Sequence, residues 1–211
     1  MPLDSFQREV LERFFRHESH FFLTGGAALA EFHLRHRDTK DLDLFTTGNM
    51  MEEGVAALHA VAEETGASLE PLRTAATFRR FLLRRGVDSV IVDLVRDLAP
   101  QIYTEKLVIG KIRVDPPQEI LVNKLCTLLA RAELRDLVDV QALARCGYSI
   151  EEAVAQAARK DGGMSPGQLA WVVSEITIGD DATPPGGVSV TELRTFLSEL
   201  QTRLTAMAFP K

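Results

Sequence analysis

The sequence predicts an α+β protein: a mixed sheet with flanking helices, followed by a helical C-terminal part. Short apolar or alternating runs typical of strands recur up to residue 115. Pro116 and Pro117 then interrupt the chain. Beyond them the alternation fades, and apolar residues recur mainly with the helical period. We therefore expect two parts, residues 1–115 and residues 116–211.

The first part contains both helical and strand patterns. Apolar residues recur with the helical period near the N-terminus, and Gly86 and Gly110 each separate two runs that resemble the strands of a hairpin. The expected elements are a helix over 4–18, a strand at 21–23, helices over 27–34 and 51–65, a strand at 41–45, and two hairpins, 78–85 with 87–95 and 106–109 with 111–114.

The second part is predicted to be helical. Helices are expected over residues 117–131, 134–145, 150–160 and 191–205, and the stretch 180–187 (DDATPPGG) is predicted to be a loop. Trp171 is expected on a further helix, with its ring in the core.

Composition excludes several classes of protein. The 211 residues are 45% hydrophobic and 26% charged, an ordinary globular mixture. Two cysteines, Cys126 and Cys146, are too few for a disulfide framework or a four-cysteine zinc site. No run approaches the roughly 20 apolar residues that span a bilayer, and no secretory signal is recognisable. We expect a cytoplasmic protein without a membrane segment. Its net charge of −6 requires any contact with nucleic acid to be local.

The most informative segment runs from Leu23 to Phe45 (LTGGAALAEFHLRHRDTKDLDLF). Gly25 and Gly26 follow a strand, where they allow a tight turn and a close approach of the backbone to a ligand. The helix that follows offers free N–H groups and the positive end of its dipole. This arrangement predicts a cradle for phosphate.

Three aspartates complete the predicted site. Asp41 and Asp43 are separated by one residue on a strand, so both side chains point to the same face. Adjacent carboxylates repel each other unless a cation lies between them, and Mg²⁺ (or Mn²⁺) takes such oxygen ligands. Asp93 lies within the apolar run VIVDLV, where an uncompensated carboxylate is costly to bury. We expect Asp93 to be a further metal ligand or a general base in a two-cation site.

These segments together resemble a known family. The matching residues are Gly25-Gly26, His36-Arg37, the run 41–45, Asp93, Lys124-Leu125 and the run 135–140. The pattern resembles the DNA polymerase β-like nucleotidyltransferase fold and, more narrowly, the AbiEii/AbiGii toxins of type IV toxin–antitoxin systems. The resemblance covers roughly residues 20–145.

The resemblance implies an enzyme that transfers a nucleoside monophosphate from an NTP to an acceptor such as the 3′ end of tRNA. It implies Mg²⁺ as cofactor, Lys124 and Arg37 as phosphate ligands, and a cognate antitoxin encoded nearby. Many such enzymes have Gly-Ser where this chain has Gly25-Gly26. Thr24 or Thr39 could supply the missing hydroxyl to the phosphates.

Each assignment has a structural alternative. Asp41 and Asp43 could line a solvent-facing strand, and Asp93 could pair with an arginine of a neighbouring strand. Lys124 could be an amphipathic lysine that reaches the surface. The arginines of residues 73–85, with Phe78 among them, suit either a nucleic-acid groove or an edge that resists aggregation.

Two other functions remain alternatives to RNA modification. Related folds modify small molecules such as antibiotics, so a small-molecule acceptor is one alternative. The other is a catalytically inactive module that binds a nucleotide or a partner, with Gly26 in place of serine marking the lost activity.

Overall fold

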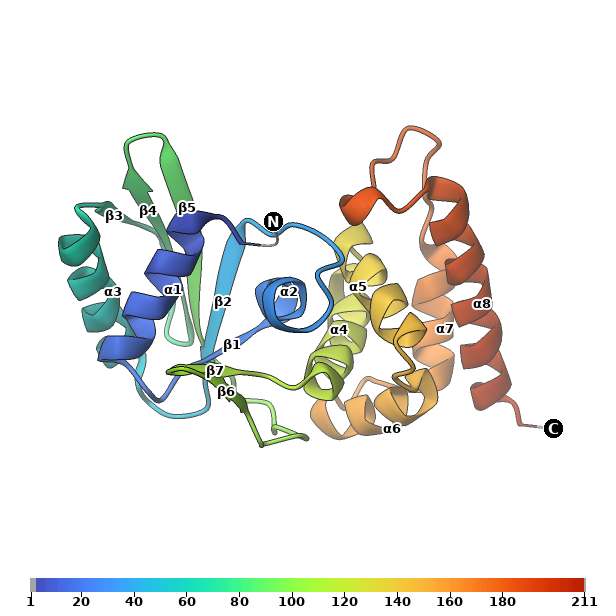
Figure 1. Cartoon of the computed structure of the whole chain (residues 1–211). Coiled ribbons are helices and arrows are strands. Elements are labelled where there is room, and N and C mark those ends of the chain that lie inside the picture. Colours follow the sequence, from blue (N-terminus) through green and yellow to red (C-terminus); the bar gives the residue numbers. More distant parts are fainter. Residues whose placement is uncertain (1–2, 211) are drawn as a thin grey trace. The chain divides into compact units, whose positions relative to one another are not determined.

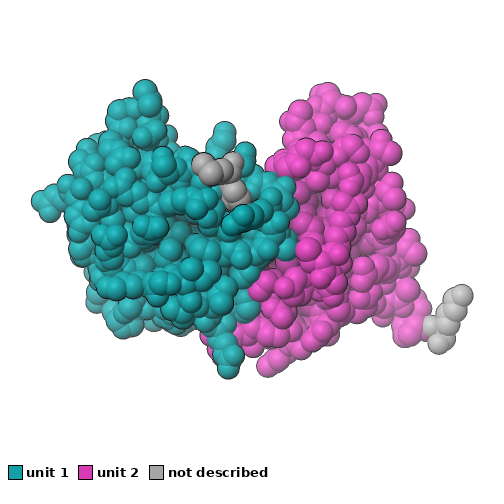
Figure 2. Space-filling view, in the orientation of Figure 1, with its two compact units in different colours: residues 1–98, 105–116 teal, residues 99–104, 117–211 magenta. Residues whose placement is uncertain are grey.

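The computed structural model describes residues 3–210, and the chain divides into two compact units (Figure 2). Unit 1 comprises Met1–Leu98 and Glu105–Pro116, and unit 2 comprises Ala99–Thr104 and Pro117–Lys211. The short segment 99–104 therefore belongs with the C-terminal helices, although it precedes the last two strands in the sequence.

Unit 1 is built on a seven-stranded mixed sheet with the strand order β3-β4-β5-β2-β1-β7-β6 (Figure 1). Strand β2 runs parallel to β5 and β1 runs parallel to β7, whereas the other neighbours are antiparallel. The strands are β1 (Phe22–Thr24), β2 (Asp41–Thr46), β3 (Ser68–Thr74), β4 (Phe78–Arg85), β5 (Asp88–Arg96), β6 (Leu107–Ile109) and β7 (Ile112–Val114). This architecture confirms the predicted fold class.

Strand β3 is the element of the sheet that the sequence pattern does not predict. It forms one edge of the sheet, its residues are largely exposed, and its pairing with β4 is irregular between Pro71 and Arg73. A proline is tolerated at such an edge, but it breaks the pattern by which a strand is recognised.

Helices α1 (Ser5–His17) and α3 (Met51–Thr65) pack against each other and against β5, on one face of the sheet (Figure 1). Helix α1 begins at a capping box, in which Asp4 accepts a hydrogen bond from the backbone of Gln7 and the Gln7 side chain accepts one from Asp4. In α3, Gly54 leaves room for Phe21 and Leu94 to lie against the helix backbone. This close packing fixes β5 beneath the two helices.

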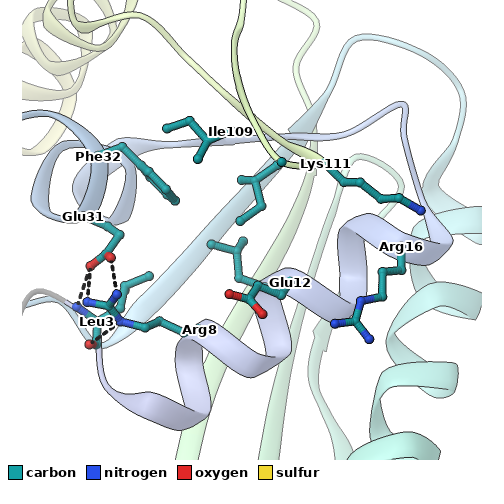
Figure 3. A pocket seen from close by; sticks show the side chains of 11 residues that line it. Leu3, Arg8, Glu12, Arg16, Glu31, Phe32, Ile109 and Lys111 are labelled. Carbon is teal, nitrogen blue, oxygen red and sulfur yellow. Dashed lines mark hydrogen bonds and ion pairs between the residues drawn. The ribbon is translucent and has the colours of Figure 1, made fainter.

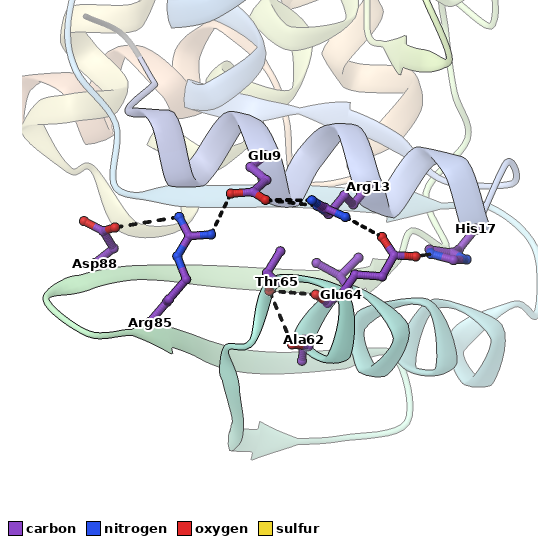
Figure 4. A network of polar contacts seen from close by, with 9 residues as sticks. Glu9, Arg13, His17, Ala62, Glu64, Thr65, Arg85 and Asp88 are labelled. Carbon is purple, nitrogen blue, oxygen red and sulfur yellow. Dashed lines mark hydrogen bonds and ion pairs between the residues drawn. The ribbon is translucent and has the colours of Figure 1, made fainter.

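A polar network also joins these helices to the sheet (Figure 4). Arg13 bonds to Glu9 at 2.9 Å and to Glu64 at 2.8 Å, and Arg85 of β4 bonds to Glu9 at 2.7 Å. The side chains are partly exposed, so each pair contributes little to stability. The main effect of the network is that Arg85 of β4 is paired with a carboxylate on this side of the sheet.

The segment after β1 differs from the expected helix over 27–34. Helix α2 (Gly25–Ala28) begins at the first glycine, and it continues as a π-helical turn, η1 (Leu29–His33). Both glycines therefore lie within the helix. Such π-helical turns often occur at functional sites.

Unit 2 is helical, as expected. Its helices are α4 (Pro117–Arg131), α5 (Leu134–Arg145), α6 (Ile150–Lys160), α7 (Pro166–Glu175) and α8 (Val190–Ala208), with a short 3₁₀ turn, η2 (Pro185–Gly187), before the last. Trp171 of α7 is 60% exposed, so the expectation that it lies in the core is wrong. None of the helices within residues 3–210 is long and apolar enough to cross a membrane.

Candidate active site

Four side chains from four neighbouring strands form a row across the sheet of unit 1. Thr24 of β1 lies opposite Asp43 of β2, Asp43 lies opposite Asp93 of β5, and Asp93 lies opposite Arg80 of β4. Residues paired in this way point to the same face of a sheet, and so does Asp41, two residues before Asp43. We call this the carboxylate face.

The opposite side of the same strands forms the core. Leu42 and Leu44 of β2 and Val92 and Leu94 of β5 are fully buried, on the side that α1 and α3 cover. Asp41 and Asp43 are half-buried. The alternation of leucine and aspartate in β2 thus places one set of side chains in the core and presents the carboxylates on the other face.

Gly25 allows the Asp43 carboxylate to lie directly against the backbone. Its φ is +64°, a left-handed conformation that glycine adopts without strain. A Cβ at this position would clash with Oδ2 of Asp43. Any other residue at position 25 would therefore displace the carboxylate.

Gly26 allows a second charged group to approach in the same way. A Cβ here would clash with the Arg37 guanidinium at Nη2. Arg37 is 8% exposed, and its Nη1 donates a hydrogen bond to the Asp38 carbonyl oxygen at 3.0 Å. The guanidinium thus occupies the space that a serine side chain would need, which gives a physical reason for glycine at position 26.

The two threonines of the predicted phosphate site differ. The Thr24 hydroxyl is buried and has no hydrogen-bond partner among the described residues, although it precedes α2 at the N-cap position. Most buried hydroxyls in proteins have a partner, so this one is suited to a ligand. The Thr39 hydroxyl instead donates a long hydrogen bond of 3.4 Å to the Asp41 carbonyl oxygen.

Asp93 is held by an arginine. Arg80 donates from Nε to Oδ1 at 2.7 Å and from Nη2 to Oδ2 at 2.6 Å, and Asp93 is only 5% exposed. These hydrogen bonds raise the pKa of Arg80 further, and the charges of Asp41 and Asp43 add to this effect. The sequence places Arg80 in a basic patch but does not identify it as a member of the site.

Two of the predicted carboxylates suit a divalent cation, and the third is paired with an arginine. Asp41 and Asp43 offer carboxylates on one face, and the glycine backbone lets Asp43 sit deep beside Thr24. Within residues 3–210, however, no three His, Cys, Asp or Glu side chains are gathered closely enough to bind an ion together. Asp93 is engaged by Arg80, so it would join a metal site through the remaining lone pairs of its oxygens.

Lys124 lies on α4 in unit 2, where two buried carboxylates bind it. Its Nζ is 2.7 Å from Asp136 and 2.7 Å from Asp139, and both aspartates are fully buried. Arg131 also approaches Asp136, at 3.3 Å. Lys124 is thus neither a surface lysine nor a lone cation, and a phosphate would have to compete with two carboxylates for it.

A separate hollow in unit 1 has a volume of about 520 Å³ and is lined by α1, η1 and the β6–β7 hairpin (Figure 3). Glu31 lies at one side of it and binds Arg8 at 2.7 Å. None of the predicted site residues lines this hollow.

The mixed sheet with its flanking helices has the polymerase β-like nucleotidyltransferase fold. The chain is similar to the nucleotidyltransferase toxin MenT4 of Mycobacterium tuberculosis, with 16% identity, 97% of this chain and 82% of that chain covered, and a TM-score of 0.59. It is also similar to JHP933 of Helicobacter pylori, with 19% identity, 95% and 91% coverage and a TM-score of 0.52. At these identities the likeness establishes the fold.

The family follows from the sequence itself. The model of the nucleotidyl transferase AbiEii toxin, from type IV toxin–antitoxin systems, matches residues 9–208. Because this match covers nearly all of the chain, the protein belongs to this family. Membership confirms the resemblance and implies a nucleotide substrate and an antitoxin partner. No curated protein sequence matches the chain significantly.

Proposed function

We propose that this protein transfers a nucleoside monophosphate from an NTP to RNA, with tRNA as the foremost candidate acceptor, in a reaction that depends on Mg²⁺. The observation that carries the proposal is the placement of Asp43 beside Gly25 and opposite Asp93, with Asp41 on the same face. Family membership supports the nucleotide substrate, and RNA is the acceptor that the family resemblance implies.

Asp41 and Asp43 would hold Mg²⁺, with Asp93 as a further ligand or as the base that takes the acceptor proton. When bound, the ion supplies positive charge against the phosphate oxygens. Each oxygen of Asp93 accepts one hydrogen bond from Arg80 and keeps a second lone pair for either role. Arg80 would therefore orient Asp93 and lower its basicity while it serves as ligand or base.

The phosphate side of the site would be formed by the start of α2. The Gly25 and Gly26 backbone, the unpartnered Thr24 hydroxyl and the Arg37 guanidinium lie around this turn. In the reaction, an acceptor hydroxyl oxygen bonds to the α-phosphorus and the bond to the β-phosphate oxygen breaks, so that pyrophosphate leaves. Arg37 would neutralise charge on the phosphates. Its guanidinium lies against Gly26, the position where many related enzymes carry serine.

The test is transfer of label from NTPs that are radiolabelled at the α-phosphate. The protein is incubated with each common NTP, Mg²⁺ or Mn²⁺, and either total tRNA or a panel of aminoglycosides. We expect label on RNA, and we expect Asp43→Asn to abolish it without loss of folding. Asp88→Asn is the matched control. It makes the same substitution at an exposed position at the start of β5, the strand next to the β2 strand that carries Asp43.

Each other outcome identifies a different function. Label on an aminoglycoside but not on RNA would assign a small-molecule acceptor. Absence of transfer to any acceptor would favour a module that binds nucleotides without turnover. Full activity in Asp43→Asn would refute the proposed site.

A further inference from the structure

The arginines of β4 divide between the two faces of the sheet. Arg79 and Arg85 point to the side of α1 and α3, where Arg79 binds Glu52 and Arg85 binds Glu9. Arg80 and Arg84 alternate with them and therefore point to the carboxylate face. Arg73 of β3 is paired with Arg80, so it lies on that face too.

The arginines of the carboxylate face are only partly neutralised. Arg80 is engaged by Asp93, but no ion pair joins Arg73 or Arg84 to a carboxylate within residues 3–210, and both side chains are exposed. Arg84 lies four residues beyond Arg80, about 13 Å further along the strand. In a chain of net charge −6, two unpaired arginines beside the row of acids form a local attraction for anions.

An aromatic ring lies among these cations. Phe78 is two residues before Arg80 and shares its face, and its ring is half-buried. The guanidinium carbons of Arg73 and Arg80 each lie 5.6 Å from the ring centroid. The contact of Arg73 with the ring is exposed to solvent and therefore weak. A nucleic-acid base could displace the Arg73 guanidinium from the Phe78 ring with little loss of free energy.

We infer that Arg73, Phe78 and Arg84 form a binding site for single-stranded RNA, which we call the hairpin platform, and that it holds the acceptor next to the carboxylates. An aromatic ring beside one exposed arginine, with a second arginine further along the same face, suits a strand that offers bases to stack and phosphates to pair. An acidic protein segment would use the arginines but would gain less from the ring. The inference rests on the proposed function for its choice of RNA as the acceptor.

The first experiment measures binding without catalysis. Fluorescence anisotropy follows a labelled single-stranded RNA of about 12 nucleotides, a length suited to such grooves, in EDTA and without NTP. We expect Phe78→Leu to weaken binding about tenfold, since stacking is lost, and Phe78→Tyr to retain it. Thermal melting by circular dichroism confirms that both variants are folded.

The second experiment tests the cations. The double variant Arg73→Ala/Arg84→Ala removes two phosphate contacts, so the slope of log K against log salt should fall by about 1.4. Arg79→Gln is the control for a general effect of charge, because it removes one positive charge from β4 on the opposite face. We expect that control to leave binding to RNA within about twofold of the unchanged protein.

The outcomes separate this inference from the proposed function. The platform is refuted if the double variant binds as the unchanged protein does, if Arg79→Gln weakens binding equally, or if a blunt duplex or an acidic peptide binds as tightly as the single strand. Label transfer to RNA that persists fully in the platform variants would uphold the function and refute the platform. Platform-dependent binding without any transfer would uphold the platform and refute the function.

Discussion

Arg80 binds both carboxylate oxygens of Asp93, at 2.7 and 2.6 Å, across two neighbouring antiparallel strands. The pairing places a permanent positive charge beside a carboxylate that the proposed reaction uses. Asp93 is buried, and an unpaired buried carboxylate is costly, so Arg80 supplies the cation that Asp93 needs. Arg80 therefore stabilises the site without a metal, and a metal bound to Asp93 would share the carboxylate with the guanidinium.

Arg80→Gln should destabilise unit 1, and Mg²⁺ should restore part of the loss. Without Arg80 the buried carboxylate lacks its partner, which costs about 1–3 kcal/mol. A cation that binds the freed carboxylate stabilises the folded state by mass action. Thermal melting with and without Mg²⁺ tests this, and Arg80→Gln/Asp93→Asn, which keeps Asp41 and Asp43, should show a smaller Mg²⁺ response. An equal response in both variants would show that Asp93 is not a ligand of the ion.

Gly26→Ser should destabilise the protein, although serine is common at this place in related enzymes. The added side chain would displace the buried Arg37 guanidinium, which should cost about 1 kcal/mol, the low end for overpacking, because the end of a flexible side chain can shift. In an Arg37→Gln background the shorter side chain removes the clash, so the same substitution should cost much less. The measurement is a double-mutant cycle by urea denaturation, and additive effects would contradict the contact.

Glu151 should make the stability of unit 2 depend on acid pH. Arg203 donates hydrogen bonds that lower the pKa of Glu151 from 4.5 to about 2 in the folded protein. The contribution is present above the unfolded pKa of 4.5 and is lost as the pH falls towards 2. Because both side chains are partly exposed, Glu151→Gln should cost less than about 1 kcal/mol near neutral pH.

The measurement is the difference in melting temperature between the unchanged protein and Glu151→Gln as a function of pH. The two proteins should converge as the pH is lowered. A difference that stays constant through this range would show that Glu151 contributes by packing and not by charge.

Most of the helices could be predicted closely because their apolar residues recur with the helical period. Helix α3 begins and ends where the sequence pattern places it, Met51–Thr65, and Gly66 terminates it in a left-handed conformation. Strand β3 could not be predicted, because an exposed edge strand carries no apolar alternation. The alternation of apolar and polar residues reveals a strand only where one of its faces is buried. A strand that buries little, such as β3, therefore lacks the pattern.

The pairing of Arg80 with Asp93 could have been predicted from the sequence. A two-residue turn at Gly86-Val87 pairs Arg85 with Asp88, and the same register brings Arg80 opposite Asp93. The pairing of Asp43 with Asp93 could not, because β2 and β5 are parallel and a long connection separates them. The approach of Arg37 to Gly26 likewise depends on how the loop before β2 folds back.

Replacement of Lys124 tests whether its role is structural or extends to the nucleotide. Lys124→Met leaves Asp136 and Asp139 buried without their shared cation, which should cost about 3–5 kcal/mol. Lost activity in this variant would therefore say nothing about phosphate binding. The triple change Lys124→Met/Asp136→Asn/Asp139→Asn removes the buried charges together, so it should recover much of the stability. If the recovered protein binds NTP as tightly as the original, Lys124 acts only within unit 2; if binding stays weak while folding is restored, the lysine contributes to the nucleotide site.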